Sequence, residues 1–92
     1  MTINDDKGKE FRAKIKYVES MIREIENQIG RKILGFSSVF GDNGQYYASF
    51  TATTSFLGYD IPYEIFMELP PKDLVIEIMR AISIEFNDYE NQ

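Results

Sequence analysis

Apolar residues recur along the first third of the chain at the spacing of an α-helix. In the stretch GKEFRAKIKYVESMIREIENQIG they are separated by alternating steps of four and three residues: Phe11, Ile15, Val18, Ile22, Ile25 and Ile29. This spacing places one apolar stripe on a helix of about 20 residues. Gly30 follows the stripe and suits the left-handed position after a helix end. The stripe could face a second chain in a coiled coil, but a helix lying on a sheet of its own chain shows the same pattern and is the interpretation we adopt.

The following residues alternate between apolar and polar, as β-strands do, around the turn sequence Asp42-Asn43-Gly44. We expect a hairpin with a three-residue loop and Gly44 in a G1 bulge, which pairs Phe40 with Tyr46. That register gathers apolar residues on one face: Leu34, Phe36, Phe40, Tyr46, Ala48, Phe50 and Ala52. A two-residue Asn43-Gly44 loop would instead set Phe36 opposite Thr51 and mix apolar with polar positions.

Two further elements complete the chain. IPYEIFMEL alternates and predicts a third strand, with Pro62 at its start or at a sheet edge. Its inward residues would be Ile61, Tyr63, Ile65, Met67 and Leu69, and its outward residues Glu64, Phe66 and Glu68. PPKDLVIEIMRAISIEFNDYE predicts a helix from about Pro71, since proline favours the first turn of a helix. Its buried stripe would be Leu74, Val75, Ile78, Met79, Ile82 and Phe86.

The predicted fold is therefore a two-layer α+β domain of order α-β-β-β-α. Its three-stranded antiparallel sheet would carry both helices on one face. The length of 92 residues predicts one domain over 1–92, with flexible tails at 1–7 and 88–92.

The sheet face opposite the helices would show water almost no charge. Its predicted residues are Ser37, Val39, Gln45, Tyr47, Ser49, Thr51, Thr53, Ser55 and Phe66. Binding surfaces are depleted of charge and enriched in aromatic residues, which favours a docking face. Ser and Thr also suit an ordinary solvated strand, so that interpretation stays open. The candidate partner-binding residues on this face are Val39, Tyr47, Thr51, Thr53 and Phe66.

Charge divides the chain into two regimes. Residues 1–32 hold eight Lys/Arg and six Asp/Glu (8 − 6 = +2), and residues 33–92 hold two and nine (2 − 9 = −7), which together give the net charge of −5. The acidic candidates for partner binding are Glu64, Glu68, Asp73, Glu77, Glu85 and Asp88. Their carboxylates could serve solubility alone, or they could steer the protein toward a basic partner.

The composition argues against catalysis. The chain has no His and no Cys, so it lacks the usual general base and a thiol nucleophile or ligand. Glu64 and Glu68, four apart in a strand, would stand about 13 Å apart, too far for a glycosidase pair. Asp42 and Asn43 belong to a turn and lack the further oxygen ligands of a calcium loop. We therefore expect no enzyme activity, no cofactor and no metal.

No stretch approaches the roughly 18 apolar residues of a membrane span, and the first residues contain no apolar leader. These features, with the absence of Cys, predict a cytoplasmic protein that does not bind membranes.

The element order resembles that of the double-stranded RNA-binding domain. That family contacts phosphates through a basic cluster at the start of its last helix. Here the matching stretch PPKDLVIE holds one Lys beside an Asp, and the hairpin turn GDNG is acidic. The basic residues of the first helix are Lys7, Lys9, Arg12, Lys14 and Lys16, interleaved with Glu10 and Glu19 as on a solvated face. The resemblance therefore implies topology, and we expect no nucleic-acid binding.

The sequence predicts a non-catalytic, acidic protein-binding module. Small acidic proteins without His and Cys are common among inhibitors of nucleic-acid enzymes, phage anti-defence proteins and bacterial immunity proteins, so we expect an inhibitor that covers a basic surface of its partner. The alternative is a homodimeric structural or assembly subunit that associates through the uncharged sheet face.

Overall fold

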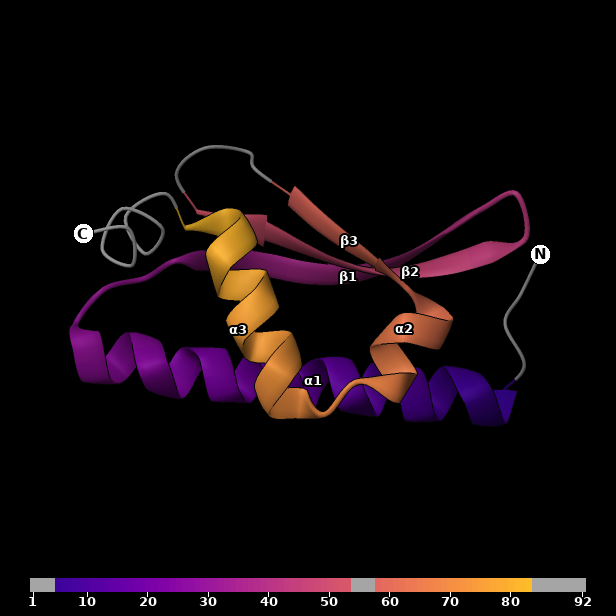
Figure 1. The fold of residues 1–92 in the computed structure, drawn as a ribbon, viewed down its shortest axis with the longest axis horizontal. Coiled ribbons are helices and arrows are strands. Elements are labelled where there is room, and N and C mark those ends of the chain that lie inside the picture. The colour runs from indigo at the N-terminus through magenta and orange to yellow at the C-terminus, as the bar shows by residue number, and fades with distance from the viewer. Residues whose placement is uncertain (1–4, 54–57, 84–92) are drawn as a thin grey trace.

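The computed structural model describes residues 5–53 and 58–83, which form helices on one side of an antiparallel sheet (Figure 1). In chain order the elements are α1 (Asp5–Ile29), β1 (Leu34–Asp42), β2 (Gln45–Ala52), β3 (Gly58–Pro62), α2 (Tyr63–Glu68) and α3 (Pro71–Ile82). The strands lie side by side in the order β1-β2-β3. The predicted α+β class with a three-stranded antiparallel sheet is confirmed.

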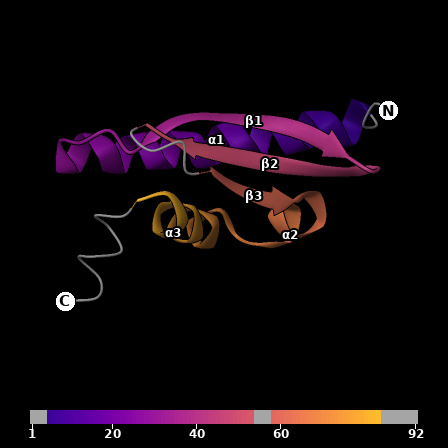
Figure 2. The same cartoon turned by 90° about the horizontal axis from the view of Figure 1, so that it is seen from above.

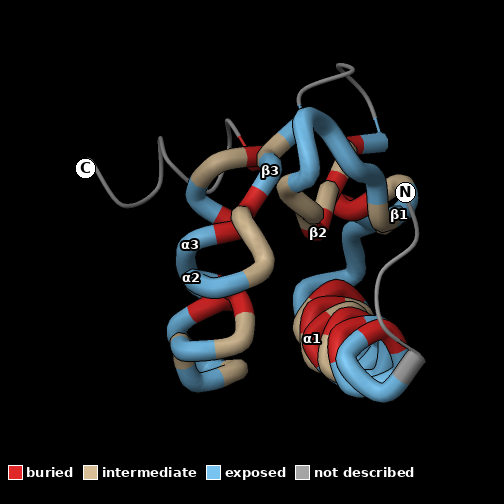
Figure 3. Tube along the Cα trace, turned by 90° about the vertical axis from the view of Figure 1, so that its right-hand side faces the viewer, coloured by how far each residue is buried: buried red, intermediate tan, exposed pale blue. Residues whose placement is uncertain are grey.

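All three helices lie against the same face of the sheet, as predicted for two. Figure 3 shows α1 beneath β1, with α2 and α3 beneath the β3 side. Seen from above, β1 forms one border of the sheet and β3 the other (Figure 2). Helix α1 begins at Asp5, inside the stretch 1–7 that was predicted as a tail, and the predicted tail 88–92 lies outside the described residues.

The apolar stripe of α1 forms one wall of the core. Phe11, Val18 and Ile22 are fully buried, whereas Ile29 at the end of the stripe is 54% exposed. Gly30 has φ +70°, so it takes the left-handed conformation predicted after the helix end. The buried residues predicted for α3 are confirmed as far as Ile82, while Phe86 lies outside the described residues.

The predicted third strand is wrong beyond Pro62, where the chain turns into α2. Apolar residues of IPYEIFMEL fit period two, but Tyr63, Phe66 and Met67 also fit one face of a helix, and short apolar runs do not distinguish the two. Phe66 decides between them, because as a helical residue it enters the core and is fully buried. Its ring lies 5.5 Å from that of Phe11 and 6.1 Å from that of Phe50.

Lys14 stabilises the end of α2. Its Nζ donates hydrogen bonds to the carbonyl oxygens of Met67 (3.1 Å) and Leu69 (2.6 Å) and lies 5.6 Å from the centre of the Phe66 ring. The last carbonyls of a helix lack partners within the helix, and a cation suits that end of the dipole. Burial lowers the pKa of Lys14. One member of the predicted basic cluster is therefore a structural contact.

The hairpin contains the two-residue turn that the apolar pattern disfavoured. Asp42 pairs with Gln45 and Phe40 with Tyr47, one residue away from the predicted register. Asn43 (φ +52°) and Gly44 (φ +79°) are both left-handed, as in a type I′ turn. This turn matches the right-handed twist of the strands, and the positive φ that it requires at both central residues explains its preference for Asn-Gly.

A bulge at Gly35 allows Leu34 to stay buried although the two-residue turn shifts the rest of β1 by one residue. Leu34 pairs with Ala52, but Phe36 pairs with Thr51, so Gly35 is an extra residue in β1. A Cβ on Gly35 would lie 3.2 Å from the carbonyl oxygens of Thr51 and Ala52, so only glycine fits without displacement. The bulge keeps Leu34 buried while Phe36 and every residue after it change face.

Glu26 anchors the beginning of β1 to α1. Its side chain is only 6% exposed, and its Oε2 accepts hydrogen bonds of 2.7 Å from the backbone N–H groups of Ile33 and Leu34. Its Oε1 lies 2.9 Å from Nη1 of Arg23, and Arg23 also donates to the carbonyls of Leu34 and Gly35. The backbone at which β1 starts is therefore held by an ion pair on α1.

The pKa of Glu26 is lowered by this arrangement. Burial acts in the opposite direction and would raise it, but the hydrogen bonds from Arg23, Leu34 and Ile33, with the charge of Arg23, outweigh burial. A carboxyl whose pKa is lower in the folded state stabilises the fold above its unfolded pKa of about 4.3, and this contribution disappears as the pH falls through the folded pKa.

We expect Glu26→Gln to lower the free energy of unfolding by about 1–3 kcal/mol at neutral pH, because an amide whose oxygen accepts from Ile33 and Leu34 turns its NH2 donor toward Nη1 of Arg23 and removes the ion pair. Urea denaturation measures this change, and the difference between the wild type and the variant should shrink as the pH is lowered from 6 toward 3. Glu24→Gln, at an exposed position of the same helix, is the control and should change stability little. A loss that is equal at all pH values would contradict the role of the carboxylate.

Candidate protein-interaction surface

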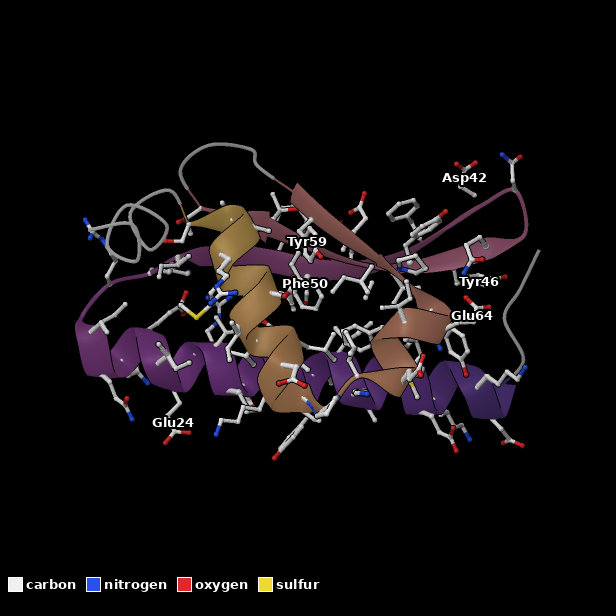
Figure 4. The ribbon with its side chains drawn as sticks, viewed as in Figure 1. Glu24, Asp42, Tyr46, Phe50, Tyr59 and Glu64 are labelled. Carbon is white, nitrogen blue, oxygen red and sulfur yellow. The ribbon has the colours of Figure 1, made fainter. Side chains whose placement is uncertain are left out.

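We call the sheet face that points away from the helices the outer face. The strand register places nine non-glycine, non-proline residues on it: Phe36, Ser38, Phe40 and Asp42 from β1, Gln45, Tyr47, Ser49 and Thr51 from β2, and Asp60 from β3. Phe50 has the opposite orientation and points from the sheet toward the helices (Figure 4). Among these described residues the only charges are Asp42, beside the turn, and Asp60, on the far strand.

An aromatic strip runs along β1 on this face. Phe36 is 58% exposed and Phe40 is 40% exposed. The ring of Phe40 stacks on that of Tyr47 across the two strands, with centroids 5.0 Å apart and an interplanar angle of 14°. We refer to Phe36, Phe40 and Tyr47 as the aromatic strip. Large apolar side chains exposed together on a charge-poor surface are typical of binding sites.

The structure separates the residues that were predicted to share this face. Tyr47 and Thr51 lie on the outer face as predicted. The predicted placement of Val39 is wrong, because the actual register turns its side chain toward the helices, where it packs against the core. The predicted placement of Phe66 on this face is also wrong, because Phe66 is a buried residue of α2. Thr53 follows β2 and its hydroxyl donates to the carbonyls of Lys32 and Ile33, so it joins two chain segments.

Phe36 and Phe40 are the binding candidates that sequence reasoning missed. They were assigned to the core because the predicted three-residue loop set them on one face with Leu34, Tyr46 and Phe50. The signal that could have found them is Asn43-Gly44, since Asn-Gly is the strongest short-range indication of a two-residue hairpin turn. That turn moves β1 by one residue and turns both rings outward.

The predicted acidic candidates that the structure describes lie on α2 and α3, on the β3 side of the molecule. Glu64 and Glu68 are exposed on α2, and Asp73 and Glu77 are exposed on α3. We call these four residues, with Asp60, the acidic flank. Glu85 and Asp88, the other predicted members, lie outside the described residues.

Glu64 connects the acidic flank to the hairpin. Its Oε2 accepts a hydrogen bond of 2.8 Å from Nε2 of Gln45, and Figure 4 shows it beside the strand that carries Tyr46. This hydrogen bond, its own backbone N–H and the charge of Lys7 lower the pKa of Glu64. The carboxylate is therefore ionised next to the outer face.

The predicted spacing of Glu64 and Glu68 is wrong. One helical turn separates them, so their Cβ atoms are about 5–6 Å apart instead of about 13 Å. Distance therefore no longer argues against an acid–base pair. A general acid needs a raised pKa in a cleft, however, whereas both residues are exposed and the pKa of Glu64 is lowered.

The described residues contain no group of three or more His, Cys, Asp or Glu arranged to hold a metal ion. None of their helices has the length and apolar character to cross a membrane. Comparison with protein-family models, curated proteins and solved structures finds no match to this chain.

Phe36 and Phe66 are a matched pair that tests the assignment of faces. We expect Phe66→Ala to lower the free energy of unfolding by about 3–5 kcal/mol, because it leaves a cavity between α1 and the sheet. Phe36→Ala should change it by less than about 0.5 kcal/mol, as is usual for exposed positions. Urea denaturation of both variants measures the difference, and equal losses would show that Phe36 is covered by its own chain.

Proposed function

We propose that this protein is a non-catalytic protein-binding module that contacts its partner through the outer face of the sheet. The observation that carries the proposal is the aromatic strip, whose Phe36 and Phe40 stand exposed on the face that no described helix covers. Aromatic side chains contribute large contact area at low entropic cost, and the central contacts of interfaces are rich in them.

The charge around the outer face favours a basic partner. Asp42 and Asp60 lie on it, Glu64 lies beside it, and no Lys or Arg from the described strands points from it. Carboxylates arranged around an apolar centre attract a positive surface and repel an acidic one. Nucleic acid is disfavoured for the same reason, since binding it needs cations against phosphate.

The role we propose is that of a cytoplasmic inhibitor that covers a basic, nucleic-acid-binding surface of its partner. Support comes from the acidic flank, from the net charge of −5 and from the compositional analogy with anti-defence and immunity proteins. The alternative, a homodimer that stacks two outer faces, is less favoured, because an isologous stack would bring Asp42 and Asp60 of both copies into one interface.

Selection from a random peptide library displayed on phage tests this proposal and does not require the partner to be identified. We expect the wild type to enrich peptides that combine Lys or Arg with apolar residues. The double variant Phe36→Ser/Phe40→Ser should bind the same synthetic peptides about tenfold more weakly or worse, because hot-spot aromatics dominate such interfaces.

Tyr17→Ser is the matched control, because Tyr17 is an equally exposed aromatic residue (57%) on α1. It should leave peptide affinity within about twofold of the wild type. Enrichment of acidic peptides, or the same loss of affinity in the Tyr17 variant as in the double variant, would contradict the proposal.

A further inference from the structure

Strand β1 is a border of the sheet with an open backbone edge. In a hairpin with a two-residue turn, the pair that flanks the turn is hydrogen-bonded, and the bonded pairs then alternate along the strands. Asp42, Phe40 and Ser38 therefore direct their N–H and C=O groups to β2. Ser37, Val39 and Gly41 direct theirs away from the sheet.

No described residue occupies this open edge between Ser37 and Gly41. Apart from the pairing with β2, the hydrogen bonds of the described residues reach the backbone of β1 only at its start, where Glu26 and Arg23 hold Leu34 and Gly35. Below the edge, the Ser37 hydroxyl donates to Glu19, so α1 approaches β1 through side chains. Open edges pair readily with another strand.

The devices that usually protect an edge are missing from this segment. It contains no Lys, no Pro and no charged residue from Leu34 to Gly41. The bulge at Gly35 lies at the start of β1, where Arg23 already binds the backbone, so it does not protect the rest of the edge. The rest of the edge is flanked on the outer face by the exposed rings of Phe36 and Phe40.

We propose that two copies of this chain pair through their β1 edges, antiparallel about a two-fold axis at Ser38. In this register Ser37 of each copy exchanges backbone hydrogen bonds with Val39 of the other, and Ser38 faces Ser38. Phe36 comes opposite Phe40 of the second copy in a non-hydrogen-bonded pair, where side chains are closest. The two exposed rings of each copy thereby cover one another.

Charge favours this pairing over a stack of outer faces. Asp60 stays on the far strand, and Asp42 falls beyond the paired residues, opposite Leu34 of the other copy. Glu19 lies on the side of α1 next to β1, since it accepts a hydrogen bond from Ser37. Arg12 and Lys16 precede it at helical spacing and therefore share this side of α1. Because α1 runs antiparallel to β1 (Figure 1), the symmetry brings Lys16 of each copy toward Glu19 of the other.

The dimer would have one continuous sheet of six strands, three from each copy, with both aromatic strips at its centre. The inference does not rest on the proposed function, because pairing requires only the purified chain.

Disulfide trapping tests the register directly, because the chain has no cysteine of its own. In the proposed dimer Ser38→Cys places two Cβ atoms across the axis in a non-hydrogen-bonded pair, with Cα atoms about 4.5 Å apart, within the range of a disulfide. Ser49→Cys is the matched control, on the same face but three strand spacings, about 14 Å, from its symmetry mate. On oxidation Ser38→Cys should form a covalent dimer at least about tenfold faster than Ser49→Cys.

The corresponding lysine variants test the same geometry without a covalent bond. Ser38→Lys sets two like charges directly opposite each other and should weaken dimerisation about tenfold or more in sedimentation equilibrium, whereas Ser49→Lys should stay within about twofold of the wild type. Circular dichroism establishes that each variant is folded. The wild type provides an independent measurement, since exchange protection of the Val39 amide should rise with protein concentration.

A wild type that remains monomeric at high micromolar concentration, with unchanged Val39 exchange, would overturn the proposal and leave the edge for a strand of another protein. A dimer that Ser49→Lys disrupts as strongly as Ser38→Lys would also overturn it, since that result means stacked faces.

Discussion

The Glu26 carboxylate and the Arg23 guanidinium together hold the backbone at which α1 passes into the sheet. One accepts from the N–H groups of Ile33 and Leu34, and the other donates to the carbonyls of Leu34 and Gly35. Both oxygens of the buried Glu26 carboxylate are therefore paired, which a buried charge requires. The junction sets where β1 begins, and the register of the hairpin depends on that starting point.

The junction and the hairpin turn together determine which residues of β1 face outward. The turn at Asn43-Gly44 fixes one end of the hairpin, and Glu26 with Arg23 fixes the other. The two constraints differ by one residue, which the bulge at Gly35 absorbs. The consequence is that Leu34 stays in the core while Phe36 and Phe40 face outward. The exposed aromatic strip is therefore a product of the register.

The two long helices and the fold class were predictable from the sequence. The stripe of α1, its end at Gly30, the start of α3 at Pro71 and the α+β class are all confirmed. Sequence reasoning failed where two patterns competed. IPYEIFMEL fits both periods, and the burial of Phe66 between Phe11 and Phe50 decides for a helix. The bulge was unpredictable because the requirement for glycine at position 35 arises only from the close approach of the β2 backbone. The buried position of Glu26 was unpredictable because its sequence context resembles that of any other acid on a helix.

Val39 faces the core and its neighbours Ser38 and Phe40 face outward, and cross-strand contacts in a nuclear magnetic resonance spectrum test this arrangement most directly. Non-hydrogen-bonded antiparallel pairs bring their Hα atoms together. We expect strong Hα–Hα contacts between Val39 and Ala48 and between Ser37 and Phe50. A contact between the Hα atoms of Phe40 and Tyr46 would contradict it, since that register returns Phe36 and Phe40 to the core.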